Sequence, residues 1–294
     1  MIAKIKGTSP SRLIFDIINF IVLTLVAMVT LYPFLYVLAA SLSKDIFILQ
    51  GKIGIIPMGF DLSAYKLVLG NKYIPIAYKN TIIYTVFGTI VNMLFTTFAA
   101  FALSRKRLPG KSFFMFLIAF TMLFSGGLIP EFMVVRNLGL LNTIWAMCIP
   151  SAISTMNLII LRTFFQNIPA ELEEAALIDG ANEILILFRV IIPVSIPAIT
   201  TISLFYAVNH WNDFFDAMIY LSDKNKFPLQ LLLRDIVIAG EVDELAGSGA
   251  DVEIQVRESV KYSTIMIATI PIVCVYPFIQ KYFVKGVMIG SIKG

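Results

Sequence analysis

Long stretches without a charged side chain recur along the chain, and short polar segments separate them. A helix needs about 20 apolar residues to cross a bilayer, and six stretches reach or approach this length. The pattern therefore predicts an all-α, polytopic membrane protein with six transmembrane helices, in a single transmembrane domain over residues 1–294. The expected spans are residues 20–42, 80–103, 112–130, 138–161, 190–210 and 262–280.

The composition agrees with a membrane protein. Hydrophobic residues make up 58% of the chain and charged residues 14%, whereas a soluble domain contains about 25% charged residues. The first apolar run is longer than the roughly 7–15 residues at the centre of a signal peptide, so we expect it to be a retained span. Cys148 and Cys274 lie inside apolar runs, which favours packing over a disulfide or a metal site.

The basic residues indicate which segments face the cytoplasm. Six spans place both termini on one side, and the inner segments would then hold only about half of the 23 basic residues. Clustering is more informative, because Arg105, Lys106, Arg107 and Lys111 crowd the turn between the second and third spans. We therefore expect this turn and both termini to be cytoplasmic, with outer loops at 43–79 and 213–261. The net charge of +4 suits an anionic lipid surface better than nucleic acid.

A short helix is predicted within the polar inner segment 168–185. Pro169 is suited to a first helical turn, where its missing N–H costs nothing. Glu171 and Glu174 follow near the positive end of the helix dipole. Gly180 is suited to a left-handed residue that ends the helix.

The predicted helix is amphipathic. Its small residues allow close approach to a partner surface, although the pattern alone also fits an ordinary amphipathic helix at the membrane interface. The residues expected to share one face, at i, i+3, i+4 and i+7, are Leu172, Ala175, Ala176 and Asp179.

The spacing from Glu174-Ala-Ala through Gly180 to Pro193 resembles the cytoplasmic loop of permease subunits in bacterial ABC importers. There a short helix docks onto an ATPase and transmits its movement to the pore. This likeness covers most of the chain. The chain as a whole is similar to the second permease subunit of maltose-type carbohydrate importers. It is closer still to the branch that carries complex oligosaccharides, oligouronides and alginate. The other stretches that carry it are 103–110, 124–130, 137–142, 205–212 and 280–286.

The resemblance implies a type I ABC importer permease fold in the bacterial cytoplasmic membrane and a non-catalytic pore subunit for oligosaccharides, uronate-containing ones among them. The implied partners are a second homologous permease, two ATPase subunits, an extracytoplasmic solute-binding protein and membrane lipid. ATP and Mg²⁺ would be bound by the ATPase subunits, and no cofactor by this chain. The residues expected at the ATPase contact are Glu174, Ala175, Ala176, Asp179 and Gly180.

A sugar pathway needs hydrogen-bonding side chains interleaved with aromatic faces. The fifth span offers both, and Tyr206, Asn209 and Asp213 would share one helical face. Polar groups in a membrane usually face the bundle interior or water. The alternative for Trp211 is an anchor in the aromatic belt at the outer interface. The candidate pathway residues are Tyr206, Asn209, Trp211, Asn212, Asn157, Ser154 and Phe124.

The loop 213–261 is the longest expected outer segment, and its part from 241 to 258 is rich in acidic residues. Gly247, Ser248 and Gly249 form its expected flexible tip. The resemblance implies that this tip contacts the binding protein. A merely solvated loop is the alternative.

Other motifs fit their usual functions poorly. Gly110-Lys111-Ser112 resembles the end of a phosphate-binding loop, but Arg105 stands where the earlier glycine is required. The glycines of Ser125-Gly126-Gly127 lie in an uncharged span, where they allow close helix packing or break the helix. His210 is the single histidine, so we expect neither a zinc site nor a catalytic residue.

The runner-up function is an ion-coupled secondary sugar transporter. Such carriers usually place carboxylates within their spans, and the six expected spans contain none. An intramembrane enzyme would need a nucleophile and base that the sequence does not offer. The sequence therefore favours the pore subunit of an ATP-driven importer.

Overall fold

The computed structural model describes residues 10–105, 107–239 and 258–291, and over these ranges every regular element is a helix. The all-α prediction is confirmed for this part of the chain. Two compact units are formed, one from residues 1–71 and 236–269 and the other from residues 72–235 and 270–294.

The first unit contains α1 (Pro10–Ser41), α2 (Asp45–Leu49), α3 (Ser63–Gly70) and the first part of α15 (Glu258–Ser291). Asp45 joins segments far apart in sequence, because its Oδ1 accepts a hydrogen bond from the N–H of Ser259 at 2.8 Å. Tyr36 packs edge-on against Tyr262, with ring centroids 5.9 Å apart. A small core lies between these contacts and contains Ala39, Ala40, Ile48 and Ile53.

Most of α1 is apolar on every side and uncovered. The most apolar window of residues 11–41 has no buried residue within the chain, and exposed side chains include Phe15, Phe20 and Leu31. A helix that is hydrophobic all round is stable only where an apolar environment surrounds it. Membrane lipid or another apolar protein surface provides such an environment.

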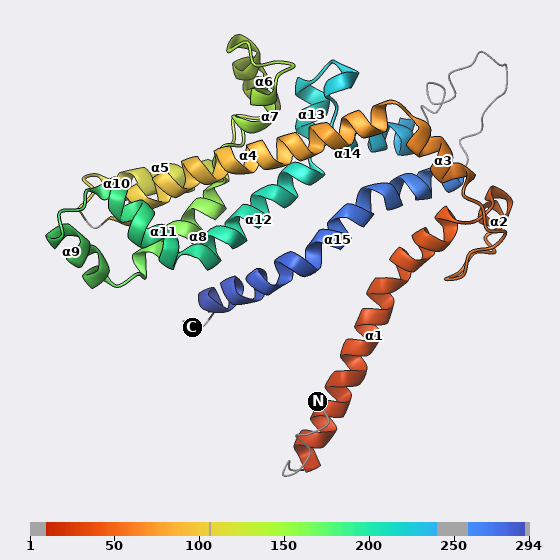
Figure 1. Ribbon diagram of the computed structural model, residues 1–294, viewed down its shortest axis with the longest axis horizontal. Coiled ribbons are helices and arrows are strands. Elements are labelled where there is room, and N and C mark those ends of the chain that lie inside the picture. The colour runs from red at the N-terminus through yellow and green to blue at the C-terminus, as the bar shows by residue number, and fades with distance from the viewer. Residues whose placement is uncertain (1–9, 106, 240–257, 292–294) are drawn as a thin grey trace. The chain divides into compact units, whose positions relative to one another are not determined.

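The second unit is built around α4 (Tyr73–Ser104), which packs along α8 (Thr155–Gln166) and α12 (Ile196–Asn212) (Figure 1). Large apolar side chains fill the space between them. The buried core of this group includes Phe101, Leu158, Leu161, Ile191, Ile202 and Tyr206.

Three of the six predicted spans are interrupted. The third is split into α5 (Lys111–Leu123) and α6 (Leu128–Asn137), whose axes differ by 115°. Gly127, with φ of 85°, lies just before α6, so the expected break at the glycines is confirmed. The prediction of one unbroken helix over 138–161 is wrong, because turns over 149–154 separate α7 (Ile144–Cys148) from α8.

The fifth predicted span also bends. The helical segment 183–194 leads into this span and contains α10 (Glu183–Ile186), the π-helix η2 (Leu187–Ile191) and α11 (Ile192–Val194). It meets α12 at 86°. Pro193 and Pro197 stand in the first turns of α11 and α12. A proline cannot donate to the preceding turn, so the expected early bend is confirmed and lies at Ser195.

The described residues contain two unbroken helices long and apolar enough to cross a membrane, 11–41 and 73–104. The α5–α6 pair and the α10–α12 pair bring the number to as many as four, if each bent pair is one span.

The interruption before α8 is held by polar side chains from α4 and α12. The amide nitrogen of Asn92 donates to the carbonyls of Ser151 (2.7 Å) and Ala152 (3.0 Å). The Tyr206 hydroxyl accepts from the N–H of Ser154 at 2.9 Å and lies 2.7 Å from the Thr96 hydroxyl. Groups released by the break are therefore satisfied within the protein, as an apolar surrounding requires.

The first half of α4 binds the segment that follows α13 (Phe215–Tyr220). Asn80 donates to the carbonyls of Asn225 and Phe227, and the Tyr84 hydroxyl donates to that of Lys226. This segment contains the 3₁₀ turn η3 (Lys224–Lys226) and is followed by α14 (Leu229–Arg234) and the π-helix η4 (Asp235–Ala239).

Gly88 allows α12 to approach α4 closely. The Nε2–H of buried His210 donates to Asn92 Oδ1 at 2.6 Å, because the Asn92 nitrogen is already donating. A Cβ on Gly88 would stand 2.4 Å from that same Nε2. The position requires glycine for space.

We predict that Gly88→Ala displaces the His210 ring and breaks its bond to Asn92. Leaving a buried polar pair unsatisfied costs roughly 1–3 kcal/mol, so thermal unfolding of the purified protein in detergent should begin at a lower temperature. Gly70→Ala is the matched control, because no atom lies within 4 Å of a Cβ there. Equal melting temperatures for both variants would contradict the packing described for Gly88.

Candidate functional site

The helix predicted within segment 168–185 is present as α9 (Ala170–Ile178). Pro169 directly precedes it, with φ of −55°, and Glu171 and Glu173 occupy its first turn. Their negative charge is favourable beside the unpaired N–H groups at the start of a helix.

Gly180 ends α9 as the sequence predicts. Its φ of 77° is left-handed. The N–H of Gly180 donates to the carbonyl of Leu177 at 3.0 Å, and that of Ala181 donates to Ala176 at 2.9 Å. These two bonds form a Schellman motif, which satisfies the last carbonyls and turns the chain sharply toward α10.

The two sides of α9 have different environments. Ala176 is half-buried and packs against the core of the second unit, while Glu174, Ala175, Asp179 and Gly180 are exposed. The predicted common face is therefore wrong in one respect, because Ala176 turns toward its own chain. The free side is extended by the large apolar Ile178, which is 87% exposed.

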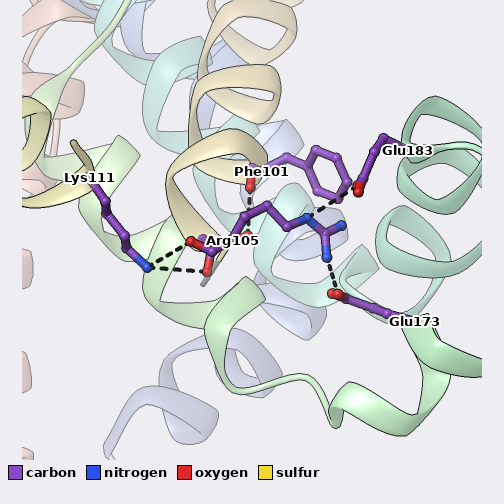
Figure 2. Close-up of polar contacts among 6 residues, drawn as sticks. Phe101, Arg105, Lys111, Glu173 and Glu183 are labelled. Atoms are coloured by element: carbon purple, nitrogen blue, oxygen red, sulfur yellow. Dashed lines mark hydrogen bonds and ion pairs between the residues drawn. The ribbon is translucent and has the colours of Figure 1, made fainter. Parts of the chain in front are cut away.

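Arg105, just beyond the end of α4, binds α9 to the second unit (Figure 2). Its guanidinium forms an ion pair and hydrogen bond with Glu173. Its Nε lies 3.6 Å from Glu183 at the start of α10. The guanidinium carbon also lies 3.8 Å from the centre of the Phe101 ring. The Arg105 side chain thus joins the end of α4 to α9 and α10, which lie at least 68 residues later in the sequence.

Two further basic residues, Lys111 of the same turn and Arg162 of α8, bind the end of α4. The Lys111 ammonium donates to the carbonyls of Ser104 and Arg105, both at 3.3 Å, and Arg162 Nε donates to that of Leu103 at 3.3 Å. The last carbonyls of a helix lack partners within it and attract positive charge. Arg105 and Lys111 of the basic turn, expected from the sequence to mark the cytoplasmic side, thus also have a structural role.

The candidate pathway residues on α12 divide between two faces. Tyr206 is 3% exposed, and with Ile202 and His210 it packs toward the rest of the unit. Asn209 and Asn212 are exposed. The prediction that Tyr206 and Asn209 present one common surface is wrong in this chain, because packing covers the tyrosine ring.

The exposed face of α12 contains Phe205, Val208, Asn209 and Asn212, at i, i+3, i+4 and i+7. The Asn212 amide donates to the carbonyl of Val208 at 2.8 Å. An aromatic ring and amides on one face are the side chains that a sugar pathway needs.

Ser154 and Asn157 lie at the start of α8. The Ser154 hydroxyl accepts from the N–H of Asn157 at 3.5 Å, and the Asn157 side chain is buried. Phe124 is exposed in the break between α5 and α6 and stacks on Phe120, with centroids 4.4 Å apart. Trp211 is half-buried, and its indole N–H is enclosed without a hydrogen-bond partner.

Asp213 follows the last residue of α12 and accepts from the N–H of Asp216 at 3.1 Å. Burial, and then the neighbouring Asp216 carboxylate, raise the pKa of Asp213 to about 7.

The expected binding-protein contact at Gly247, Ser248 and Gly249 lies outside the described residues. Within the described residues, no group of three or more His, Cys, Asp or Glu side chains is arranged to hold a metal ion. Cys148 is buried and Cys274 exposed, and both are free thiols.

Comparison with known proteins decides the family. The family described as "Binding-protein-dependent transport system inner membrane component" matches residues 74–289. The chain belongs to this family. It therefore shares its origin with permease components rather than with catalytic subunits, and the permease assignment made from the sequence is confirmed.

Named relatives agree with this. The permease is 46% identical over 286 residues to the polygalacturonan/rhamnogalacturonan transport system permease protein YtcP of Bacillus subtilis, covering 96% of this chain and 99% of the relative. It is 29% identical to the trehalose/maltose transport system permease protein MalG of Thermococcus litoralis, covering 92% and 94%. The carbohydrate class inferred from the sequence is thus represented among its homologues.

A solved structure gives the same result. The permease is similar to a chain from the crystal structure of a bacterial ABC transporter involved in import of the acidic polysaccharide alginate. The TM-score is 0.85 and the identity 40%, and the match covers 94% of this chain and 99% of that one. The predicted importer permease fold is confirmed.

Among the contacts that the sequence did not predict are those of Arg105 and Asn92. Arg105 pairs with Glu173 across a long interval, and no local spacing predicts such a pair. Asn92 had a usable signal, because a polar side chain within an apolar span usually faces the interior and has a specific partner.

We predict that Gly180→Leu disrupts the end of α9, whereas Gly180→Asn preserves it. No atom lies within 4 Å of a Cβ at Gly180, so the obstacle is the left-handed backbone, which asparagine tolerates better than leucine. Limited proteolysis of the permease in membranes should show faster cleavage near residue 180 in the leucine variant only. Identical cleavage of both variants would show that the left-handed turn is not required.

Proposed function

We propose that this permease is one of two homologous pore subunits of an ATP-driven importer for acidic, uronate-containing oligosaccharides. The second pore subunit, two ATPase subunits that bind ATP and Mg²⁺, and an extracytoplasmic binding protein complete the complex. The chain crosses the cytoplasmic membrane six times with both termini inside, and the segment 168–185 faces the cytoplasm.

The observation that carries the proposal is α9, an exposed helix with a fixed end on a chain of this family. Its free side presents Glu174, Ala175 and Ile178 while Glu173 and Ala176 attach it to its own unit. A helix that is attached on one side and exposed on the other is suited to transmit movement from a docked subunit.

The substrate class is supported by the relatives. The names of two of them specify polygalacturonan/rhamnogalacturonan and alginate. These polymers contain uronic acid residues, so their fragments are anionic at neutral pH. The exposed face of α12, with its amides and Phe205, is suited to sugar hydroxyls and ring faces in such fragments.

Within the proposed pathway, the candidate residues divide by role. Asn209 and Asn212 of α12 and Phe124 between α5 and α6 are exposed and suited to contact sugar, and half-buried Trp211 is also on α12. Tyr206, Ser154 and Asn157 support the pathway wall from within, because burial and mutual hydrogen bonds hold them.

We predict that the complete complex, reconstituted in vesicles, imports short oligogalacturonates only when ATP and the binding protein are supplied. An ion gradient alone should give no uptake, which separates this mechanism from the ion-coupled carrier considered above. Maltotriose serves as a neutral competitor of similar size and should compete weakly. Preference for maltotriose would overturn the acidic substrate class, and gradient-driven uptake would overturn the mechanism.

We predict that Glu174→Lys weakens association with the ATPase subunits and lowers transport several-fold, because it reverses an exposed charge on the free side of α9. Membrane insertion should be unchanged. Glu131→Lys, the same reversal on exposed α6, is the control and should leave co-purification of the ATPase intact. Unaltered co-purification and transport in the Glu174 variant would remove α9 from the ATPase contact.

A further inference from the structure

We propose that Arg105 is a positioning residue that locks α9 to the inner end of α4, so that the two move together. The inference rests on the proposed docking of α9 onto an ATPase. It goes further by assigning the attachment on the permease side to one guanidinium and its acidic partners.

Burial distinguishes the two acidic partners. The side chains of Arg105 and Glu173 are 18% and 27% exposed, whereas that of Glu183 is 65% exposed. Glu173 also forms a hydrogen bond, but the 3.6 Å approach of Glu183 does not. Because shielded pairs are screened less by water and salt than exposed ones, Glu173 provides most of the attachment.

The guanidinium is fixed on its own side as well. The Phe101 ring lies against its face, as Figure 2 shows, and the Lys111 ammonium binds the carbonyls of Ser104 and Arg105. Phe101 belongs to the buried core around α4. The attachment of α9 is therefore anchored in the buried core of the second unit.

Arginine is suited to this position for reasons that lysine does not share. A planar guanidinium stacks on an aromatic ring and presents several donors toward two carboxylates at once. Lysine keeps the positive charge but loses the stacking on Phe101 and the planar set of N–H donors. Arg105→Lys should therefore retain only part of the attachment.

Ala176 and Ala175 allow the attachment to be measured directly. Ala176 is half-buried against the core and Ala175 is exposed. In full-length chain carrying Cys274→Ser, a cysteine at 176 should react slowly with a maleimide in membrane vesicles, and one at 175 quickly. Arg105→Gln should speed the reaction at 176 several-fold and leave 175 unchanged.

The variants should follow an order set by the contacts. Glu173→Gln should speed labelling at 176 nearly as much as Arg105→Gln, with Arg105→Lys in between and Glu183→Gln having a small effect. Arg107→Gln, which changes an exposed arginine of the same turn, is the control and should have none. Unchanged labelling in both Arg105→Gln and Glu173→Gln would overturn the proposal.

Charge exchange separates positioning from a general loss of folding. In the assembled complex, Arg105→Glu and Glu173→Arg should each lower transport per ATP hydrolysed, and the double variant should restore it in part. Failure of the double variant to restore either coupling or slow labelling at 176 would also overturn the proposal.

Failure of the proposed function would look different. Adding the ATPase subunits should protect the cysteine at 175, because that residue lies on the free side of α9. Absence of protection would contradict ATPase docking itself, whereas normal protection with no effect of Arg105 variants would contradict only the positioning role.

Discussion

Backbone groups within a membrane need partners inside the protein, and this requirement explains how the second unit is organised. Unpaired N–H and C=O groups are costly in hydrocarbon, yet three of the expected spans are interrupted. Side chains on α4 and α12 supply partners for the interruption before α8. Asn92 of α4 binds two carbonyls, and Tyr206 of α12 receives an N–H. The interruption before α8 is therefore stabilised by the positions of α4 and α12.

The two ends of α4 contact different parts of the unit. Near its start, α4 binds the segment 225–229 through Asn80, Thr81 and Tyr84. At its end, the turn at Arg105 binds α9 and α10. With 32 residues, α4 is about 48 Å long, more than the hydrocarbon thickness of about 30 Å. One unbroken helix thus has polar contacts with other segments near each of its ends.

Much of this fold could be predicted from hydrophobic pattern and local residue signals. Long apolar runs predicted α1 and α4, the glycines near 126 predicted a break, and Pro193 and Pro197 predicted a bend. Gly180 predicted the left-handed end of α9. Each of these signals depends only on residues that are close in the sequence, so the sequence alone is sufficient to predict these features.

What sequence could not give depends on contacts between distant segments. The turns over 149–154 lie in an uncharged run that looks like one helix, and the bonds from Asn92 and Tyr206 explain why they are stable. Tyr206 has the chemistry of a sugar contact but is covered by packing. Arg105 and Glu173 carry no common local pattern, so their pairing emerges only when α4 and α9 are placed together.

The attachment of α4 at both ends has a thermodynamic consequence. Coupling between two sites is reciprocal: if events at one site change affinity at the other, the reverse effect has the same free energy. In the importer proposed above, movement of α9 would be transmitted through α4 to the segment 225–229, and binding beside that segment would in turn affect α9. The helix α4 would therefore transmit the effect of ATP hydrolysis from α9 to the segment 225–229, and it would transmit the effect of binding beside that segment back to the ATPase.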